Sequence, residues 1–166
     1  NFYRLRASFF NEIDDKKLAI LDFSKLISLE PNNPNNYEDR GKLSLKIEDL
    51  KSALGDFSKA IELNPNDQIL YILRANTFKG LKNYDAAIED WKHIENSSDN
   101  KTQFLSYLGI AEAETKKNLH EKNIKFFSKA FDYCEKLNDL NPELSISYAI
   151  RCFIFVKCDI PLNDFK

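Results

Sequence analysis

The chain has 166 residues, of which 43% are hydrophobic, enough to form the core of a soluble folded protein. Its 24 basic residues nearly balance 26 acidic ones, so the net charge of -2 supplies no basic surface and disfavours nucleic acid as a partner. The longest apolar stretch, residues 146–156, is too short to cross a bilayer, which disfavours membrane insertion.

The three cysteines, Cys134, Cys152 and Cys158, form no CxxC pair and have no nearby histidine. Spacings typical of metal sites and redox motifs are therefore missing. This pattern favours a reducing compartment, and we expect a cytoplasmic location. Because the chain opens on Asn1 rather than Met, we expect it to be a fragment of a longer protein.

The sequence repeats itself with a period of 34 residues. One shift superposes aromatic, charged, small and turn positions together, which chance does not explain. The superposed sets are Tyr3, Tyr37 and Tyr71; Arg6, Arg40 and Arg74; Ala19, Ala53 and Ala87; Asp22, Asp56 and Asp90; Phe23, Phe57 and Trp91; and Pro31 and Pro65.

Five units follow one another along the chain, and the apolar spacing within each predicts two helices. The units cover approximately residues 1–33, 34–67, 68–101, 104–141, whose second helix is extended, and 145–166, which is incomplete. Breaks are expected at Pro31 and Pro65 between units and at Asn83 before a second helix. A capping-box-like pair, Asn118 with Glu121, predicts the next such break. Hairpins of this size cannot bury their apolar faces alone, so neighbours must stack.

A 34-residue helix–turn–helix unit of this pattern resembles the tetratricopeptide repeat (TPR), and the resemblance covers the whole chain. Unit two matches the family pattern with Tyr37, Gly41, Ala53, Phe57, Ala60 and Pro65. Unit three departs from it with Ile94 and Asp99 at the last two positions. The resemblance implies an all-α, right-handed solenoid of antiparallel helix pairs, with four repeats and the first part of a fifth in one domain over residues 1–166.

In three units an arginine stands sixteen residues before an aspartate. The pairs are Arg6 with Asp22, Arg40 with Asp56, and Arg74 with Asp90. In unit four the corresponding residues are Ile110 and Phe126, so both charges are replaced together. This joint change favours a structural ion pair between the two helices of a hairpin over a ligand site.

Residues able to perform catalysis are sparse. His93 and His120, the two histidines, sit in different units without a cysteine or paired carboxylates at ligand spacing, and the four glycines form no phosphate-binding loop. We therefore expect no enzyme active site, no metal and no cofactor.

In the TPR family the first helices line a groove that holds peptides or helices of partner proteins, so the resemblance implies protein binding. The groove positions of units one and two are mostly polar and of mixed charge, namely Asn1, Arg4, Ser8, Asn11, Asn35, Glu38, Lys42 and Leu45. Those of units three to five are largely apolar, and the candidate partner-binding residues are Ile69, Ile72, Leu73, Asn76, Leu105, Leu108, Glu112, Ile146 and Phe153. The family's clamp for the C-terminal carboxylate of chaperones is absent at the corresponding positions.

Three hypotheses follow for function. The first is a non-catalytic scaffold whose groove in repeats three to five binds a peptide or amphipathic helix. The second is a regulatory or targeting module of a larger enzyme or effector, with the groove covered by another part of the parent chain. The third is self-association through the ends of the solenoid, where apolar surfaces are exposed.

Overall fold

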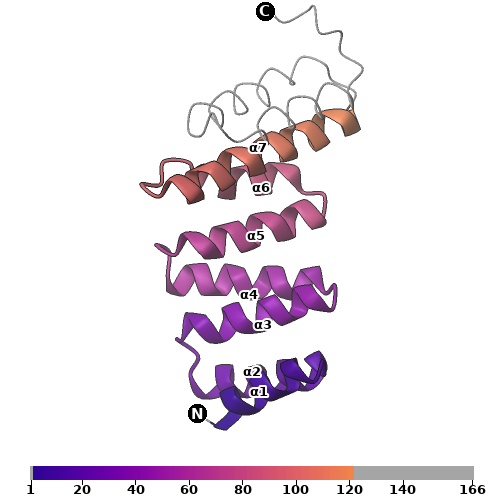
Figure 1. The fold of residues 1–166 in the computed structure, drawn as a ribbon, viewed down its shortest axis with the longest axis vertical. Helices are drawn as coiled ribbons and strands as arrows, with labels where there is room; N and C mark the ends of the chain where they lie inside the picture. The colour runs from indigo at the N-terminus through magenta and orange to yellow at the C-terminus, as the bar shows by residue number, and fades with distance from the viewer. Residues whose placement is uncertain (1, 122–166) are drawn as a thin grey trace, which may run out of the picture. The chain divides into compact units, whose positions relative to one another are not determined.

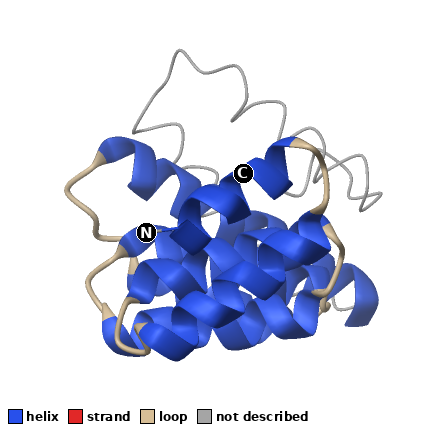
Figure 2. Ribbon diagram, turned by 90° about the horizontal axis from the view of Figure 1, so that it is seen from below, coloured by secondary structure: helices blue, strands red, loops and turns tan. Residues whose placement is uncertain are grey.

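The computed structural model of the protein describes residues 2–121. In this part of the chain every regular element is a helix (Figure 2). The helices are α1 (Phe2–Glu12), α2 (Lys16–Leu29), α3 (Pro34–Lys46), α4 (Leu50–Leu63), α5 (Gln68–Gly80), α6 (Tyr84–His93) and α7 (Asn100–Glu121). Over the same residues, none of the helices combines the length and the apolar character that crossing a membrane requires.

The structure divides into two compact units, of which the first is Asn1–Lys82 and the second is Asn83–Lys166. The 34-residue units of the sequence are called repeats below. The first unit contains α1 to α5, and each of these helices packs against the next one in sequence (Figure 1). The described part of the second unit contains α6 and α7, which pack against each other. The structure is therefore built from antiparallel neighbours joined by short turns.

The turn before each second helix has the same construction in three successive repeats. A side chain caps the helix by accepting a backbone N–H bond three residues ahead, and the residue before the cap has a positive φ. The caps are Asp15, Asp49 and Asn83, and the preceding residues are Asp14, Glu48 and Lys82, with φ of 66°, 63° and 60°. First helices are capped similarly, because Asn33 accepts from Asn35 N and Asp67 from Ile69 N. The 34-residue period thus reappears as a period of caps.

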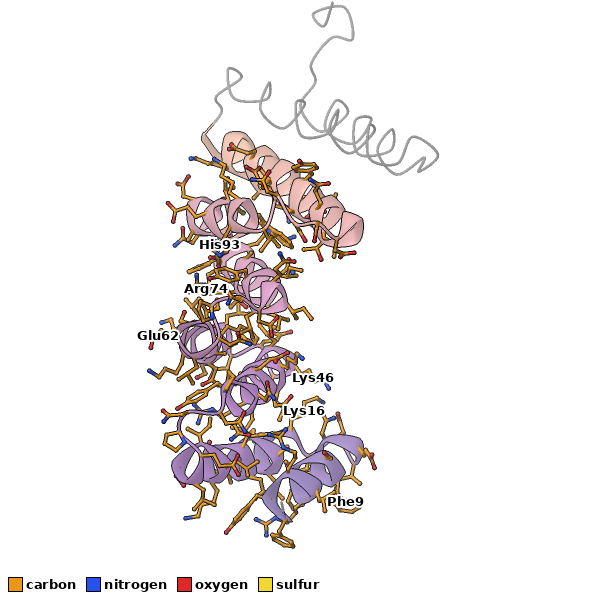
Figure 3. The ribbon with its side chains drawn as sticks, turned by 90° about the vertical axis from the view of Figure 1, so that its left-hand side faces the viewer. Phe9, Lys16, Lys46, Glu62, Arg74 and His93 are labelled. Atoms are coloured by element: carbon orange, nitrogen blue, oxygen red, sulfur yellow. The ribbon has the colours of Figure 1, made fainter. Side chains whose placement is uncertain are left out.

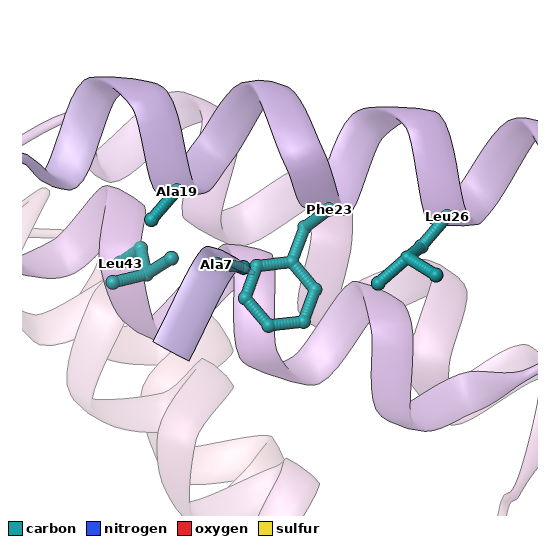
Figure 4. Close-up of a cluster of buried hydrophobic side chains, with 5 residues drawn as sticks. All are labelled: Ala7, Ala19, Phe23, Leu26 and Leu43. Carbon is teal, nitrogen blue, oxygen red and sulfur yellow. The ribbon is translucent and has the colours of Figure 1, made fainter. Parts of the chain in front are cut away.

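Phe23 of α2 anchors the core of the first hairpin. Its ring points toward Ala7 of α1, and Leu26 and Leu43 pack in the same cluster (Figure 4). Leu43 belongs to α3, so this cluster also joins the first hairpin to the second. The core of the first repeat is consequently shared with the second, as stacking requires.

The helix pairs approach closely because small residues face large aromatic ones. A Cβ added at Gly41 would lie 2.7 Å from Phe57, whose side chain is fully buried. In the second unit, a Cβ at Gly109 would lie 2.3 Å from Trp91. Because glycine has no side chain, these two positions leave room for the aromatic rings.

One expected break is not present. Asn118 and Glu121 were expected to begin a second helix, but α7 runs without interruption from Asn100 to Glu121. Residues 111–121 consist mostly of Ala, Glu, Lys and Leu, which favour helix, and they contain no Gly or Pro. A single Asn inside such a segment does not end a helix.

Gly41 and Gly55 of the second repeat provide a matched test of this packing. We expect Gly41→Ala to lower the free energy of unfolding by about 1 to 3 kcal/mol, because the new methyl group would overlap the Phe57 ring. An added Cβ at Gly55 meets nothing within 4 Å, so Gly55→Ala should raise stability by about 0.5 to 1 kcal/mol through helix propensity. Urea unfolding measures both, and equal effects of the two substitutions would contradict the assigned close contact.

Candidate interaction surfaces

A bidentate ion pair between arginine and aspartate joins the two helices within each of the first two hairpins. Arg40 Nε donates to Asp56 Oδ2 at 2.9 Å and Nη2 donates to Oδ1 at 2.6 Å. Arg6 contacts Asp22 in the same way, at 2.8 Å and 2.5 Å. In both pairs the arginine lies on the first helix and the aspartate on the second. The bidentate ion pair therefore stabilises the packing of the two helices of the hairpin.

The same arginine position also reaches back to the preceding repeat. Arg40 Nη1 donates to Ser24 Oγ at 3.0 Å, and Arg74 Nη1 lies 3.5 Å from Ser58 Oγ. Each serine stands sixteen residues before its arginine and belongs to the second helix of the preceding hairpin. One side chain therefore links three helices, which identifies it as part of the scaffold.

The carboxylates of these pairs are buried, while the arginines are partly accessible. The side chains of Asp22 and Asp56 are 4% and 7% exposed, against 44% for Arg6 and 25% for Arg40. The hydrogen bond from Arg6 lowers the pKa of Asp22, and the hydrogen bond to Asp56 raises the pKa of Arg40.

The third expected pair, Arg74 with Asp90, has one member in each unit, so a contact between them stays a prediction. The side chain of Asp90 is buried. The Arg74 guanidinium lies over the rings of Tyr71 and Phe78, at 5.7 Å and 5.9 Å from their centroids.

A second repeated contact was not anticipated from the sequence. Tyr37 Oη donates to the carbonyl oxygen of Pro31 at 3.0 Å, and Tyr71 Oη donates to that of Pro65 at 3.1 Å. The tyrosine of each first helix thereby fixes the turn that enters its repeat. The constant spacing of six residues between proline and tyrosine was the signal that could have revealed it.

A polar cavity of about 250 Å3 lies between α1 and α3. The groove positions of repeats one and two contribute four of its lining residues, namely Arg4, Ser8, Asn11 and Lys42. Most of the charge here is already neutralised within the protein. Arg4 donates to Asp39 at 2.7 Å, Lys42 contacts Glu38 at 2.6 Å, and Lys46 donates to Asn11 at 3.0 Å.

The apolar candidates lie on two helices, one in each unit. On α5, Ile69, Ile72, Leu73 and Asn76 follow the spacing of a single helix face. Ile69 is 57% exposed, Asn76 is exposed, and the other two are half-buried. On α7, Leu105, Leu108 and Glu112 also share one face and are half-buried. Ile146 and Phe153 fall outside the described residues.

Titratable side chains do not gather into a reactive cluster in the part of the chain that is described. Over residues 2–121 no group of three or more His, Cys, Asp or Glu is placed to hold a metal ion. His93 is exposed on the last turn of α6. The surfaces described above can therefore offer hydrogen bonds, charges and apolar contacts to another molecule.

The buried carboxylate makes the Arg40–Asp56 pair sensitive to loss of one partner. We expect Arg40→Met to cost about 3 kcal/mol of unfolding free energy, because it strands the Asp56 carboxylate in the core. The double variant Arg40→Met with Asp56→Leu should cost less than the single one, since apolar residues can replace a buried pair. Ile110, fully buried at the corresponding place of α7, shows that this position accepts an apolar side chain. Additive losses in a double-mutant cycle would refute the pairing.

The lowered pKa of Asp22 predicts a loss of stability in acid. Its unfolded-state pKa is about 3.9, so its contribution is complete above that pH and is lost as pH falls through the lower folded-state pKa. The stability advantage of the wild type over Asp22→Asn should therefore shrink as pH falls below about 4. Thermal melts over this range measure it. Asp15→Asn serves as the control, because asparagine caps a helix as well as aspartate does.

No family model matches the sequence, and no curated protein matches it either. Several solved structures nevertheless resemble the chain. MamA from Desulfovibrio magneticus RS-1 is 19% identical, with a TM-score of 0.76 over 95% of this chain and 84% of that chain. A tetratricopeptide repeat protein from Parabacteroides merdae is 18% identical, with a TM-score of 0.74 over 93% of this chain and 57% of that one.

YrrB, described as a TPR protein with an unusual peptide-binding site, is 15% identical, with a TM-score of 0.55 over 90% of each chain. At these identities the likeness concerns the fold. It agrees with the helix pairs, the repeated caps and the 34-residue period found in the chain itself. The protein thus has the tetratricopeptide repeat fold.

Proposed function

We propose that the chain is a non-catalytic scaffold that binds a peptide or an amphipathic helix of another protein. The proposed apolar contacts lie on the first helices of repeats three to five. They include Ile69, Ile72 and Leu73 on α5 of the first unit, and Leu105 and Leu108 on α7 of the second unit. The observation that carries this proposal is the contrast between the apolar groove positions of these helices and the mostly polar groove positions of the first helices in repeats one and two.

Exposure supports α5 as a binding helix. Ile69 is 57% exposed, and Ile72 and Leu73 lie beside it on one face of the helix. An apolar face gains free energy when a partner removes it from water, at roughly 25 cal/mol for each Å2 buried. An amphipathic helix that presents residues at positions i, i+3, i+4 and i+7 matches such a face.

The cavity between α1 and α3 is less suited to provide the main contact. An acidic partner would have to compete with Asp39 for Arg4 and with Glu38 for Lys42. Exchanging one such exposed ion pair for another yields only about 0 to 1 kcal/mol. Polar side chains here are better suited to orient a partner than to hold it.

The fold is compatible with peptide binding, as the description of YrrB shows for that protein. The alternative proposal is that another part of a longer parent chain covers the apolar residues of α5 and α7. In that case the repeats would act as a regulatory or targeting module of an enzyme or effector. The half-buried state of Leu105 and Leu108 is consistent with either occupant.

Peptide-display selection on the purified chain tests the proposal. We expect the wild type to enrich amphipathic peptides, and Ile72→Glu and Leu108→Glu each to weaken their binding at least about tenfold, which corresponds to 1.4 kcal/mol. Leu45→Glu is the matched control, because Leu45 is a half-buried leucine at a groove position of the polar α3. Circular dichroism must show that all variants stay folded. Equal loss of binding in all three variants, or no enrichment by the wild type, would exclude this site.

A further inference from the structure

The second repeat has a serine where the repeats on either side of it have a phenylalanine. Ser44 lies 34 residues after Phe10 and 34 residues before Phe78, at the same place in the first helix. In repeats one and three the phenylalanine ring lies beside the arginine of the hairpin. The Arg6 guanidinium is 5.9 Å from the centroid of Phe10, and the Arg74 guanidinium is 5.9 Å from that of Phe78. The equal distances indicate that this position normally places a ring beside the arginine.

The second repeat has a cavity where its neighbours have this ring. Ser44 is 3% exposed, and it lines a cavity of about 550 Å3 that is formed by residues of α2, α3 and α4. Arg40, the arginine of this hairpin, lines the same cavity. Among the described residues no aromatic ring lies over its guanidinium as one does in repeats one and three. A cavity of roughly 150 Å3 already holds a benzene ring, so this one has room for a ring and more.

Gly55 of α4 leaves one wall of the cavity open. A Cβ added at Gly55 would meet no other atom within 4 Å, and Gly55 itself is exposed. The residues at the same position of repeats one and three are Leu21 and Glu89, which are both much larger. The second repeat therefore combines a small residue at the floor of the cavity, Ser44, with the smallest possible residue at its wall.

The Ser44 hydroxyl is a buried polar group without a partner within the described residues. Other hydroxyls in these helices bond the carbonyl oxygen four residues earlier. Ser24 Oγ donates to Ile20 O at 2.8 Å, and Thr77 Oγ1 donates to Leu73 O at 2.8 Å. Because an unbonded polar group loses its hydration when it is buried, a ligand that offers it a hydrogen bond gains free energy. The floor of the cavity is thus suited to a ligand with a polar tip.

The charges around the cavity are already satisfied within the protein. Both basic residues of the lining are paired, because Arg40 is bonded to Asp56 and Lys59 donates to Glu62 at 2.7 Å. Figure 3 labels Glu62 on α4. Asp49, a further acid of the lining, is the N-cap of α4, where the helix dipole stabilises its charge. Since an anion or a cation would have to displace one of these partners, the site favours a neutral ligand.

We propose that this cavity binds a phenol ring, carried either by a tyrosine side chain of another protein or by a small molecule. The ring enters beside Gly55 and packs against the flat face of Arg40, as Phe10 and Phe78 pack beside the arginines of their own repeats. Its hydroxyl group lies at the leading end of the ring and bonds Ser44 Oγ at the floor. The site shares no residue with the apolar contacts proposed on α5 and α7.

NMR titration of the complete isotope-labelled chain with p-cresol tests this proposal. We expect saturable shifts of the amide signals of Arg40, Ser44 and Gly55. Toluene, which lacks the hydroxyl group, should bind about two- to tenfold more weakly, as the loss of one hydrogen bond predicts. Ser44→Ala should abolish this difference. N-acetyltyrosinamide distinguishes the two sources of the ring, because tighter binding than p-cresol supports a tyrosine side chain and weaker binding supports a small molecule.

Two substitutions that fill the cavity should prevent binding. Ser44→Phe supplies the ring that repeats one and three have, and Gly55→Leu supplies the residue found at Leu21. We expect each of them to raise the dissociation constant of p-cresol at least about tenfold. Ser8→Phe is the matched control, because Ser8 lines the other cavity, between α1 and α3, and it should leave the affinity unchanged. Thermal melts should show Ser44→Phe to be at least as stable as the wild type, since the ring occupies free space.

No saturable binding of p-cresol to the wild type would overturn the proposal. Unchanged affinity in both cavity-filling variants would do the same, as would an equal loss in Ser8→Phe. If Ser44→Phe melted far below the wild type, the space at Ser44 would be too small for a ring, and Gly55→Leu would then decide whether the ligand binds here. Equal affinities of toluene and p-cresol for the wild type would refute the hydrogen bond to Ser44 and with it the choice of a phenol.

Discussion

The stacked arrangement of the first unit depends on how a buried carboxylate is satisfied. Asp22 and Asp56 lie inside the helix pairs, where an unpaired charge would cost several kcal/mol. An arginine exactly sixteen residues earlier in sequence reaches each of them from the first helix. The Arg40 guanidinium also bonds Ser24 of the preceding hairpin. The arginine that neutralises Asp56 therefore also links its hairpin to the preceding one. The nitrogens of the arginine are consequently occupied by the scaffold and are not free to recognise a ligand.

The first helices carry two kinds of surface, which differ in whether their side chains can be satisfied by contacts within the protein. Where side chains are polar, as around Arg4 and Lys42, they bond to one another and the surface is nearly neutral. Where they are apolar, as at Ile69, no such internal solution exists, and only a second molecule or another segment can remove them from water. The affinity of this fold for a partner should therefore come mainly from its apolar positions, with polar ones adjusting orientation.

Regular features of the fold could be predicted from sequence because they recur. Pro31 and Pro65 mark the turns, and Asn83 caps α6 where the period places it. The prediction failed at Asn118, where a local capping signal competes with a helix-forming segment and no second copy of the signal was available for comparison. The solvent exposure of single residues could not be predicted from the sequence either. Ile69 and Ile72 are both isoleucines at groove positions of the same helix, yet Ile69 is exposed and Ile72 is half-buried. This difference depends on how the neighbouring helices pack.

The first hairpin shows why the exceptions to a repeat are informative. Phe2, Asn36 and Leu70 occupy one repeat position, yet the first is exposed and the other two are buried. A position whose environment is a neighbouring hairpin selects residues for that neighbour, and Asn36 illustrates this by bonding Arg4 of the first hairpin. At the first hairpin the residues at such positions, Phe2 and Phe9, are large, apolar and exposed. A repeat position therefore predicts the burial of its side chain only together with the hairpin that packs on it.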